Sequence, residues 1–435
     1  MLPYRNCIFM YLWHINNEHK VIRMRIIVLL SFIASISLSN AAVWNSDKEW
    51  TVEWEQKYSQ WMTTSAVYAT MFRDKKSKYY GISADCADAA YALRAIFAFE
   101  NSLPFAVVMP TGSKKKVSFS NKQSRFDKYG AENRRLVAMV NYLADVVGSE
   151  SLTLNDTYPI AIKTIAPSAL YTYKIKARFG KRIRHVYTIK DVTKNGNFDL
   201  IYSTQAIRKK KMPMNYRKSK ALVNKPQGNW GFRRLKWPSL LFASSSQYPV
   251  ELGYSREQYS LIQGKSAAQF FRFVKDQLKV EDETPDQVVT RAMKSLCEEA
   301  QARIKYVDQG VEHNLKTRRC MNYEDFDAYS TPARDKGLKE IYSSLFEELR
   351  ALSEAGEGLV VNNELSDLAV TIFRYKSASL ESKAALLEYC PITYTEGKTI
   401  DLGELFTRQQ KNLLSSHPND NVYRRWGEKV GKKTR

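Results

Sequence analysis

Residues 85–99 read DCADAAYALRAIFAF, and this stretch decides the fold of the first half of the chain. Its Ala, Leu, Ile and Phe side chains recur at the three- and four-residue spacing of one helix face. Ser83 or Asp85 can cap the start of such a helix by accepting hydrogen bonds from its first turn. The sequence therefore predicts a helix that begins near Cys86 and ends at Asn101-Ser102-Leu103-Pro104.

Beyond this helix the pattern changes to short strands. Residues 105–109 predict a strand, 111–130 a polar loop and 131–147 a second helix. Residues 160–204 alternate apolar and polar side chains, which indicates antiparallel strands. The alternating segments are IAIKTI (160–165), ALYTYKIKA (169–177), HVYTIKDV (185–192) and NFDLIYST (197–204). Asn195-Gly196 predicts a hairpin turn between the last two.

The remaining segments give the domain organisation. Residues 42–78 are rich in Trp and Tyr at helical spacing and predict a helical segment with its aromatic side chains in the core. Residues 79–205 predict an α+β domain, a helix followed by a small antiparallel sheet. Residues 206–255 are dense in Lys and Arg and predict a basic, loop-rich connector, and residues 256–435 predict a mainly α-helical C-terminal region. Its helices are expected at 266–279, 285–306, 336–354, 363–375, 380–389 and 403–414.

Residues 1–41 have the pattern of a signal peptide. Ile26–Leu38 is a mostly apolar stretch preceded by Arg23 and Arg25, and small residues follow it in Ser39-Asn40-Ala41. As a helix the stretch would be about 20 Å long, too short to cross a bilayer core. We therefore expect export to the periplasm or the extracellular space, with no stable membrane span after cleavage; an uncleaved anchor helix is the alternative. Met24 offers a second start site for the same leader.

Composition places the chain among ordinary globular proteins. Of its 435 residues, 44% are hydrophobic and 26% are charged, which excludes collagen, a coiled-coil rod and wholesale disorder. The formal net charge is +22, and removal of the leader would leave +19. An exported chain this basic is expected to associate with an anionic polymer of the cell envelope, although charge alone does not select the partner.

Four cysteines would remain after cleavage, far fewer than in a disulfide scaffold. Cys297, Cys320 and Cys390 share the C-terminal half, where we expect one disulfide with Cys297–Cys320 as the first candidate. Cys86 stands alone in the front half. No cofactor is expected, and no dedicated zinc site, because the mature histidines are widely spaced and no cysteine pair has ligand spacing.

Cys86 and His185 form the candidate catalytic pair. Cys86 stands at the first turn of the predicted helix, and His185 begins a predicted strand. A helix N-terminus and an imidazolium both stabilise a thiolate, which lowers the pKa of the thiol and activates it as a nucleophile. Between residues 42 and 260 the chain has no other cysteine and no other histidine, which makes the pairing specific.

These residues resemble a known superfamily. Asp85-Cys86-Ala87-Asp88 with its apolar helix, and His185-Val-Tyr-Thr-Ile followed by residues 198–204, are similar to NlpC-type peptidoglycan endopeptidases and to transglutaminase-like cysteine peptidases. The resemblance covers residues 79–205 and implies a papain-like core that cleaves amide bonds, with peptidoglycan stem peptides as substrate. The loop and helix at 111–150 would then be an insertion, because Cys86 and His185 are 99 residues apart.

The same resemblance suggests the remaining members of the site. Asp199 is the first choice to orient His185 and Asn197 is the alternative, since both lie on the next predicted strand and share a face by two-residue alternation. Tyr80, or Tyr79 beside it, is a weaker candidate for the oxyanion hole, together with the backbone N–H of Cys86.

A basic run surrounds the predicted histidine strand. It either binds an anionic polymer or forms a solvated surface, and the sequence leaves both open. Single-stranded nucleic acid would also suit basic residues interleaved with aromatic ones, but export makes it the less expected partner. The residues proposed for polymer binding are Lys174, Lys176, Arg178, Lys181, Arg182, Arg184, Arg208, Lys209, Lys210 and Lys211.

Taken together, the sequence predicts an exported cysteine hydrolase, an amidase or endopeptidase, with an α+β papain-like core. Cys86 would attack the carbonyl and His185 would transfer the proton. The alternatives are a catalytically inactive envelope-binding protein on the same core and a secreted protein that binds anionic polymer or nucleic acid. The bond cleaved, the choice between hydrolysis and transamidation, and the oligomeric state stay open.

Overall fold

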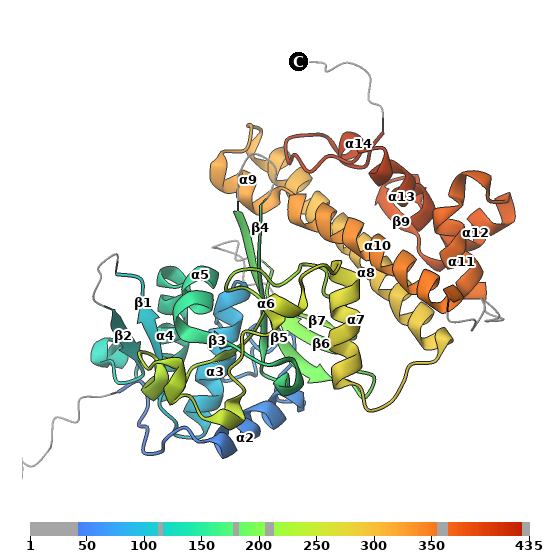
Figure 1. Cartoon of the computed structure of the whole chain (residues 1–435). Coiled ribbons are helices and arrows are strands. Elements are labelled where there is room, and N and C mark those ends of the chain that lie inside the picture. Colours follow the sequence, from blue (N-terminus) through green and yellow to red (C-terminus); the bar gives the residue numbers. More distant parts are fainter. Residues whose placement is uncertain (1–41, 112–115, 177–181, 205–212, 355–363, 429–435) are drawn as a thin grey trace, which may run out of the picture.

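The computed structural model describes residues 42–111, 116–176, 182–204, 213–354 and 364–428, and it has a mixed α+β fold (Figure 1). The predicted leader, residues 1–41, lies outside these ranges. In the ranges that are described, no helix is both long enough and apolar enough to span a bilayer.

The predicted central helix is α3, Cys86–Glu100. Asp85 caps it by accepting hydrogen bonds from the backbone N–H groups of Ala87 and Asp88, and the Asp88 side chain accepts one from the backbone N–H of Asp85. Every residue from Cys86 to Ala98 is buried, not only those of one face. The many alanines account for this, because their short side chains let neighbouring elements pack on all sides of the helix.

Six antiparallel strands form the main sheet, in the order β3-β8-β4-β5-β6-β7. Their bounds are β3 Thr157–Pro159, β4 Leu170–Lys176, β5 Arg182–Val192, β6 Phe198–Tyr202, β7 Asn215–Arg217 and β8 Phe232–Leu235. A separate pair joins β1, Ala106–Met109, to β2, Val117–Ser120. The predicted turn between β5 and β6 is confirmed: Gly196 has φ +74°, and a Cβ there would lie 2.5 Å from the carbonyl oxygen of Lys275.

Two strands come from the segment that we expected to be a loop-rich connector. β7 and β8 lie within residues 206–255, and β8 sits between β3 and β4. β8 was not predicted because two adjacent arginines, Arg233 and Arg234, are typical of an exposed loop. Both are buried, however, and donate hydrogen bonds to backbone carbonyls. The expected strand at 160–165 is instead a 3₁₀ turn, Ile162–Thr164.

Each helix predicted in the second half is present, although α8 extends eleven residues beyond its predicted end, and α6, α9 and α14 were not predicted. α8 and α10 lie side by side (Figure 1). Helices in the first half are α2 Val52–Thr63, α4 Glu132–Val146 and α5 Ser149–Ser151. The later ones are α6 Gln258–Leu261, α7 Ala267–Leu278, α8 Pro285–Thr317, α9 Tyr323–Tyr329, α10 Pro332–Glu354, α11 Glu364–Phe373, α12 Leu380–Tyr389, α13 Leu402–Gln410 and α14 Val422–Arg425. A short hairpin, β9 Ile392–Thr395 with β10 Lys398–Ile400, interrupts this helical region.

Two hydrophobic cores divide the chain near residue 280. The first runs from Val43 to Val274 and includes Phe270 and Val274 of α7. The second runs from Val289 to Trp426. Phe270 and Val274 of α7 thus belong to the core of the sheet, and α7 also contacts α10 of the later region.

The disulfide joins Cys297 to Cys390, with their Cα atoms 5.8 Å apart, and not to Cys320 as expected first. The reason is the length of α8, which continues to Thr317 and at 1.5 Å per residue carries the chain about 30 Å away from Cys297. Cys320 is a free, exposed thiol just past this helix.

Candidate active site

Cys86 and His185 line the same cavity, which has a volume of about 990 Å³. One wall is formed by the start of α3 and by the tyrosine-rich face of β4 and β5. The other wall comes from the helical region, with His313 of α8, Tyr329 of α9 and Arg334 of α10. The cavity thus lies between the two hydrophobic cores, and both contribute side chains to it.

Cys86 is the first residue of α3, and its sulfur accepts a hydrogen bond from the backbone N–H of Val186. Val186 follows His185 on β5. In the antiparallel register, the residue opposite Val186 comes directly after the end of β6. The fold therefore brings the nucleophile candidate to the residue next to the candidate base, although 99 residues separate them in the sequence.

The His185 ring is packed in a cluster of tyrosines. Its centroid lies 4.5 Å from that of Tyr187, 5.5 Å from Tyr202 and 5.6 Å from Tyr173. Tyr173 is the direct cross-strand partner of His185 on β4. Across the described part of the chain, no hydrogen bond joins the imidazole to the Cys86 thiol, although both side chains line one cavity.

Burial governs the protonation of both groups. It raises the pKa of the Cys86 thiol well above its ordinary value of 9, and the nearby Asp85 carboxylate adds to the effect. Burial, with the charges of Arg334 and Lys220, lowers the pKa of His185 to about 3. At neutral pH the pair therefore consists of a thiol and a neutral imidazole, and the buried, cationic surroundings of His185 disfavour its protonated form.

Asp199 lies far from His185 along the sheet. It is paired with Asp191, six residues along β5 from His185, which corresponds to about 20 Å. Its carboxylate accepts hydrogen bonds from the Tyr216 hydroxyl and the Ser219 N–H, each at 2.8 Å. The structure therefore does not bring Asp199 to the imidazole that it was expected to orient.

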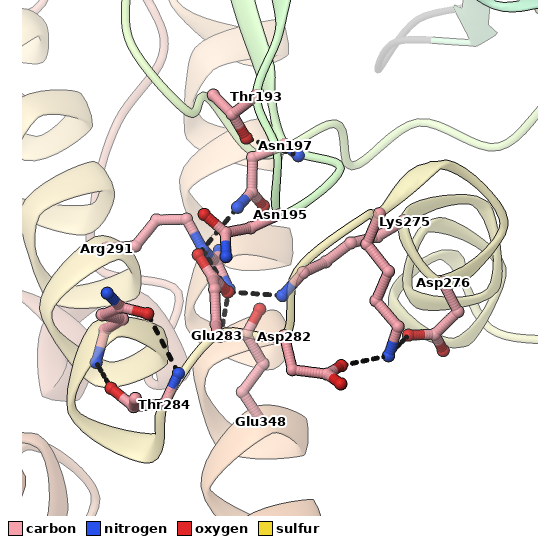
Figure 2. A network of polar contacts seen from close by, with 12 residues as sticks. Thr193, Asn195, Asn197, Lys275, Asp276, Asp282, Glu283, Thr284, Arg291 and Glu348 are labelled. Carbon is pink, nitrogen blue, oxygen red and sulfur yellow. Dashed lines mark hydrogen bonds and ion pairs between the residues drawn. The ribbon is translucent and has the colours of Figure 1, made fainter.

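Asn197 is also at the turn end of the hairpin. Its side-chain amide donates a hydrogen bond of 2.7 Å to Glu283, in a polar cluster with Lys275 and Arg291 (Figure 2). Tyr80, the oxyanion candidate, is 42% exposed and is not among the described residues that line the cavity.

The basic run divides into several environments. Arg182 and Arg184 line the cavity, and Lys176 is exposed. Lys174 pairs with Glu150 at 2.7 Å, and Arg184 pairs with the same carboxylate. The other members, Arg178, Lys181, Arg208, Lys209, Lys210 and Lys211, lie outside the described residues.

Several cavity residues were not identified from the sequence. Lys220 and Glu299 form a buried ion pair, and Arg334 lies over the Tyr306 ring. None has a local motif, because they come from distant elements that only the packing of the helical region on the sheet brings together. Tyr173 and Tyr187 could have been found, since strand alternation and pairing place them on the face of His185.

Among the residues that the structure describes, no three His, Cys, Asp or Glu side chains gather in a group that could hold a metal ion. No protein-family model matches the chain, and no curated protein or solved structure shows significant similarity to it.

Proposed function

We propose that the protein is an exported cysteine hydrolase that acts on amide bonds, with Cys86 as nucleophile and His185 as general base. One observation carries this proposal: the Cys86 sulfur lies at the backbone N–H next to His185, and both side chains line one large cavity. A thiol at a helix N-terminus near a histidine that can act as its base is an arrangement that supports nucleophilic cleavage of amide bonds.

The chemistry begins from the neutral pair. As the Cys86 sulfur bonds to the substrate carbonyl carbon, His185 takes the thiol proton and then passes it to the departing amine. Water, deprotonated by His185, then attacks the thioester and releases the acid and the free thiol. The backbone N–H of Cys86, at the start of α3, supplies a donor for the developing oxyanion.

Peptidoglycan stem peptides are the proposed substrate class, by the resemblance of residues 79–205. Export of the chain is part of this proposal, and the Cys297–Cys390 disulfide supports it, since such bonds persist mainly in oxidising compartments. The cations that line the cavity suit a negatively charged envelope polymer.

A second candidate is a non-catalytic protein that binds anionic polymer on the same core. It is favoured by the raised pKa of the Cys86 thiol and by the distance of Asp199 and Asn197 from His185. A binding protein needs neither a reactive thiol nor an oriented imidazole, and its affinity would fall steeply with salt.

The two candidates differ in the reactivity of Cys86. We would measure iodoacetamide labelling of each free cysteine by mass spectrometry, in the wild type and in His185→Ala, from pH 4 to pH 9. The hydrolase predicts that His185→Ala slows Cys86 labelling about a hundredfold at pH 7, a typical contribution of a general base. Exposed Cys320 is the internal control and should react equally in both proteins.

The pH profile sharpens this test. Because the pKa of His185 is lowered to about 3, its imidazole stays neutral, and the His185-dependent part of the rate should not decline between about pH 8 and pH 4. Slow labelling that is indifferent to His185 and rises only with alkaline pH would contradict the hydrolase. Binding to an anionic polymer by Cys86→Ser at several salt concentrations would then test the second candidate.

A further inference from the structure

Arg334 is a cation of the helical region that faces the candidate catalytic pair. It belongs to the first turn of α10 and lines the cavity together with His185. Its guanidinium carbon lies 3.1 Å from the centroid of the Tyr306 ring on α8. The Tyr306 hydroxyl in turn shares a hydrogen bond of 3.1 Å with Thr204, which follows β6 and also lines the cavity. The guanidinium is therefore held in place by an aromatic face that is itself fixed to the sheet side.

The other cations at the cavity differ from Arg334. Lys220 is paired with Glu299, and Arg184 is paired with Glu150, while Arg182 is exposed. For Arg334, the described part of the chain shows stacking on Tyr306 but no carboxylate within ion-pair distance; Glu299, whose pKa Arg334 helps to lower, is paired with Lys220. A partly buried guanidinium that stacks on a ring keeps its edge N–H groups available, and these match a carboxylate.

The local backbone adds to this preference for an anion. The first turn of a helix has N–H groups without intrahelical acceptors and carries partial positive charge. Pro332, Ala333 and Arg334 of that turn all line the cavity. The acid in the same turn, Asp335, is already bound to Arg303 at 2.7 Å and accepts a hydrogen bond from Thr331, so it does not neutralise Arg334.

We infer that Arg334 is the specificity-determining residue of this cavity and binds a free carboxylate of the substrate while the scissile carbonyl lies at Cys86. The inference rests on the proposed hydrolase and names its substrate class: a peptide or acyl chain with a carboxylate a few bonds from the cleaved amide. It also gives the helical region a function, because the α+β core by itself would lack this contact.

Haloacetyl probes of graded length test the inference on the full chain. N-iodoacetylglycine and N-iodoacetyl-β-alanine carry a carboxylate, and their carboxamides are neutral controls with the same reactive group. Each alkylates a thiol in one step, in which the sulfur–carbon bond forms and iodide leaves. The measured quantity is the ratio of carboxylate to carboxamide labelling rates at Cys86, read by mass spectrometry at pH 8. Cys320 provides the same ratio for an exposed thiol in the same protein.

In the wild type, the ratio of carboxylate to carboxamide labelling rates should be about ten times higher at Cys86 than at Cys320 for at least one probe length. This is the size expected for a charge-assisted hydrogen bond. Arg334→Gln should abolish the preference, and Arg334→Lys should retain part of it. Lys336→Gln removes the same charge from an exposed position of α10 and should leave the ratio unchanged. A wild type without preference at either length, or a preference that survives Arg334→Gln, would overturn the inference.

This result is separable from the proposed function. The response of iodoacetamide labelling to His185→Ala reports on the hydrolase, whereas the probe ratio reports on Arg334. If the probe ratio depends on Arg334 but iodoacetamide labelling of Cys86 is unchanged by His185→Ala, the protein has a carboxylate-binding site and is not a hydrolase. The opposite pair of results would retain the hydrolase and remove only the role of Arg334.

Discussion

The two ends of the β5–β6 hairpin carry similar polar residues but use them differently. At the open end, His185 lies among tyrosines at the cavity that Cys86 also lines. At the turn end, Asp199 and Asn197 make hydrogen bonds that hold neighbouring segments. A polar residue on the strand that follows a histidine strand is therefore not necessarily close enough to hydrogen-bond the imidazole. The antiparallel register decides which residues of the two strands lie opposite each other.

The turn end connects the two hydrophobic cores. Glu283 lies in the α7–α8 linker with its side chain 6% exposed, and it accepts hydrogen bonds from Asn197 at 2.7 Å and from Arg291 at 3.0 Å (Figure 2). Lys275 of α7 binds the same carboxylate. The cluster fixes the linker to the hairpin, and through the linker it fixes the position of the helical region that forms one wall of the cavity.

The largest effect is expected from removing the centre of this cluster. Glu283→Ala leaves Lys275 and Arg291 without their shared carboxylate in a largely buried site, and should lower the free energy of unfolding by about 3 kcal/mol. Denaturant unfolding followed by circular dichroism measures this loss. Burial would raise the pKa of Glu283, but Arg291 and Lys275 lower it, so the stabilisation is present above pH 4.5 and is lost as the pH falls below the lowered pKa.

The matched control is Glu281→Gln. Glu281 pairs with Lys194 at the same turn, but both side chains are more than half exposed. Solvent screens such a pair, so its loss should change the free energy of unfolding by about 0.5 kcal/mol or less. Equal effects of the two substitutions would show that Glu283 does not anchor the linker.

The next largest effect is expected on the reactivity of Cys86, and it distinguishes His185 at the open end of the hairpin from Asp199 at the turn end. His185→Ala should slow labelling of Cys86 about a hundredfold at pH 7, whereas Asp199→Asn should leave the rate within about twofold, because its carboxylate lies about 20 Å from the imidazole. Labelling kinetics on folded variants measure both. A large effect of Asp199→Asn on labelling, without loss of stability, would restore Asp199 as a member of the catalytic site.

The smallest effect concerns the stability provided by Asp199 itself. Its two oxygens accept hydrogen bonds from Tyr216 and from the N–H of Ser219. Asparagine keeps one acceptor and replaces the other with a donor, so Asp199→Asn should lower the free energy of unfolding by about 1 to 2 kcal/mol. Thermal unfolding measures the loss, and Tyr216→Phe removes one of the two bonds as an independent comparison.

Much of the fold could be predicted because local signals agree with it. The alanine-rich apolar run predicted α3, Asn195-Gly196 predicted the hairpin turn, and the periodic segments predicted α7, α10, α11, α12 and α13 within about four residues. The start of α8 was also predicted, but not its end, and α9 was not predicted. β8 could not be predicted, because Arg233 and Arg234 read as surface charge until their buried hydrogen bonds are seen. The disulfide partner was wrong for a similar reason, since the unbroken length of α8 is not evident from the cysteine spacing.

For the candidate site, the sequence by itself determined the residue types and the element that holds each one: Cys86 at the start of a capped helix, and His185 on a strand, which begins at Arg182 and not at His185 as expected. Helix caps and strand alternation are local properties, set by neighbours a few residues apart. The tertiary structure decided which groups share the cavity. It placed Asp199 and Asn197 at the far end of the hairpin, and it brought Lys220, Glu299 and Arg334 from distant segments to His185. Those positions follow from strand register and from the packing of two cores, which no local pattern encodes.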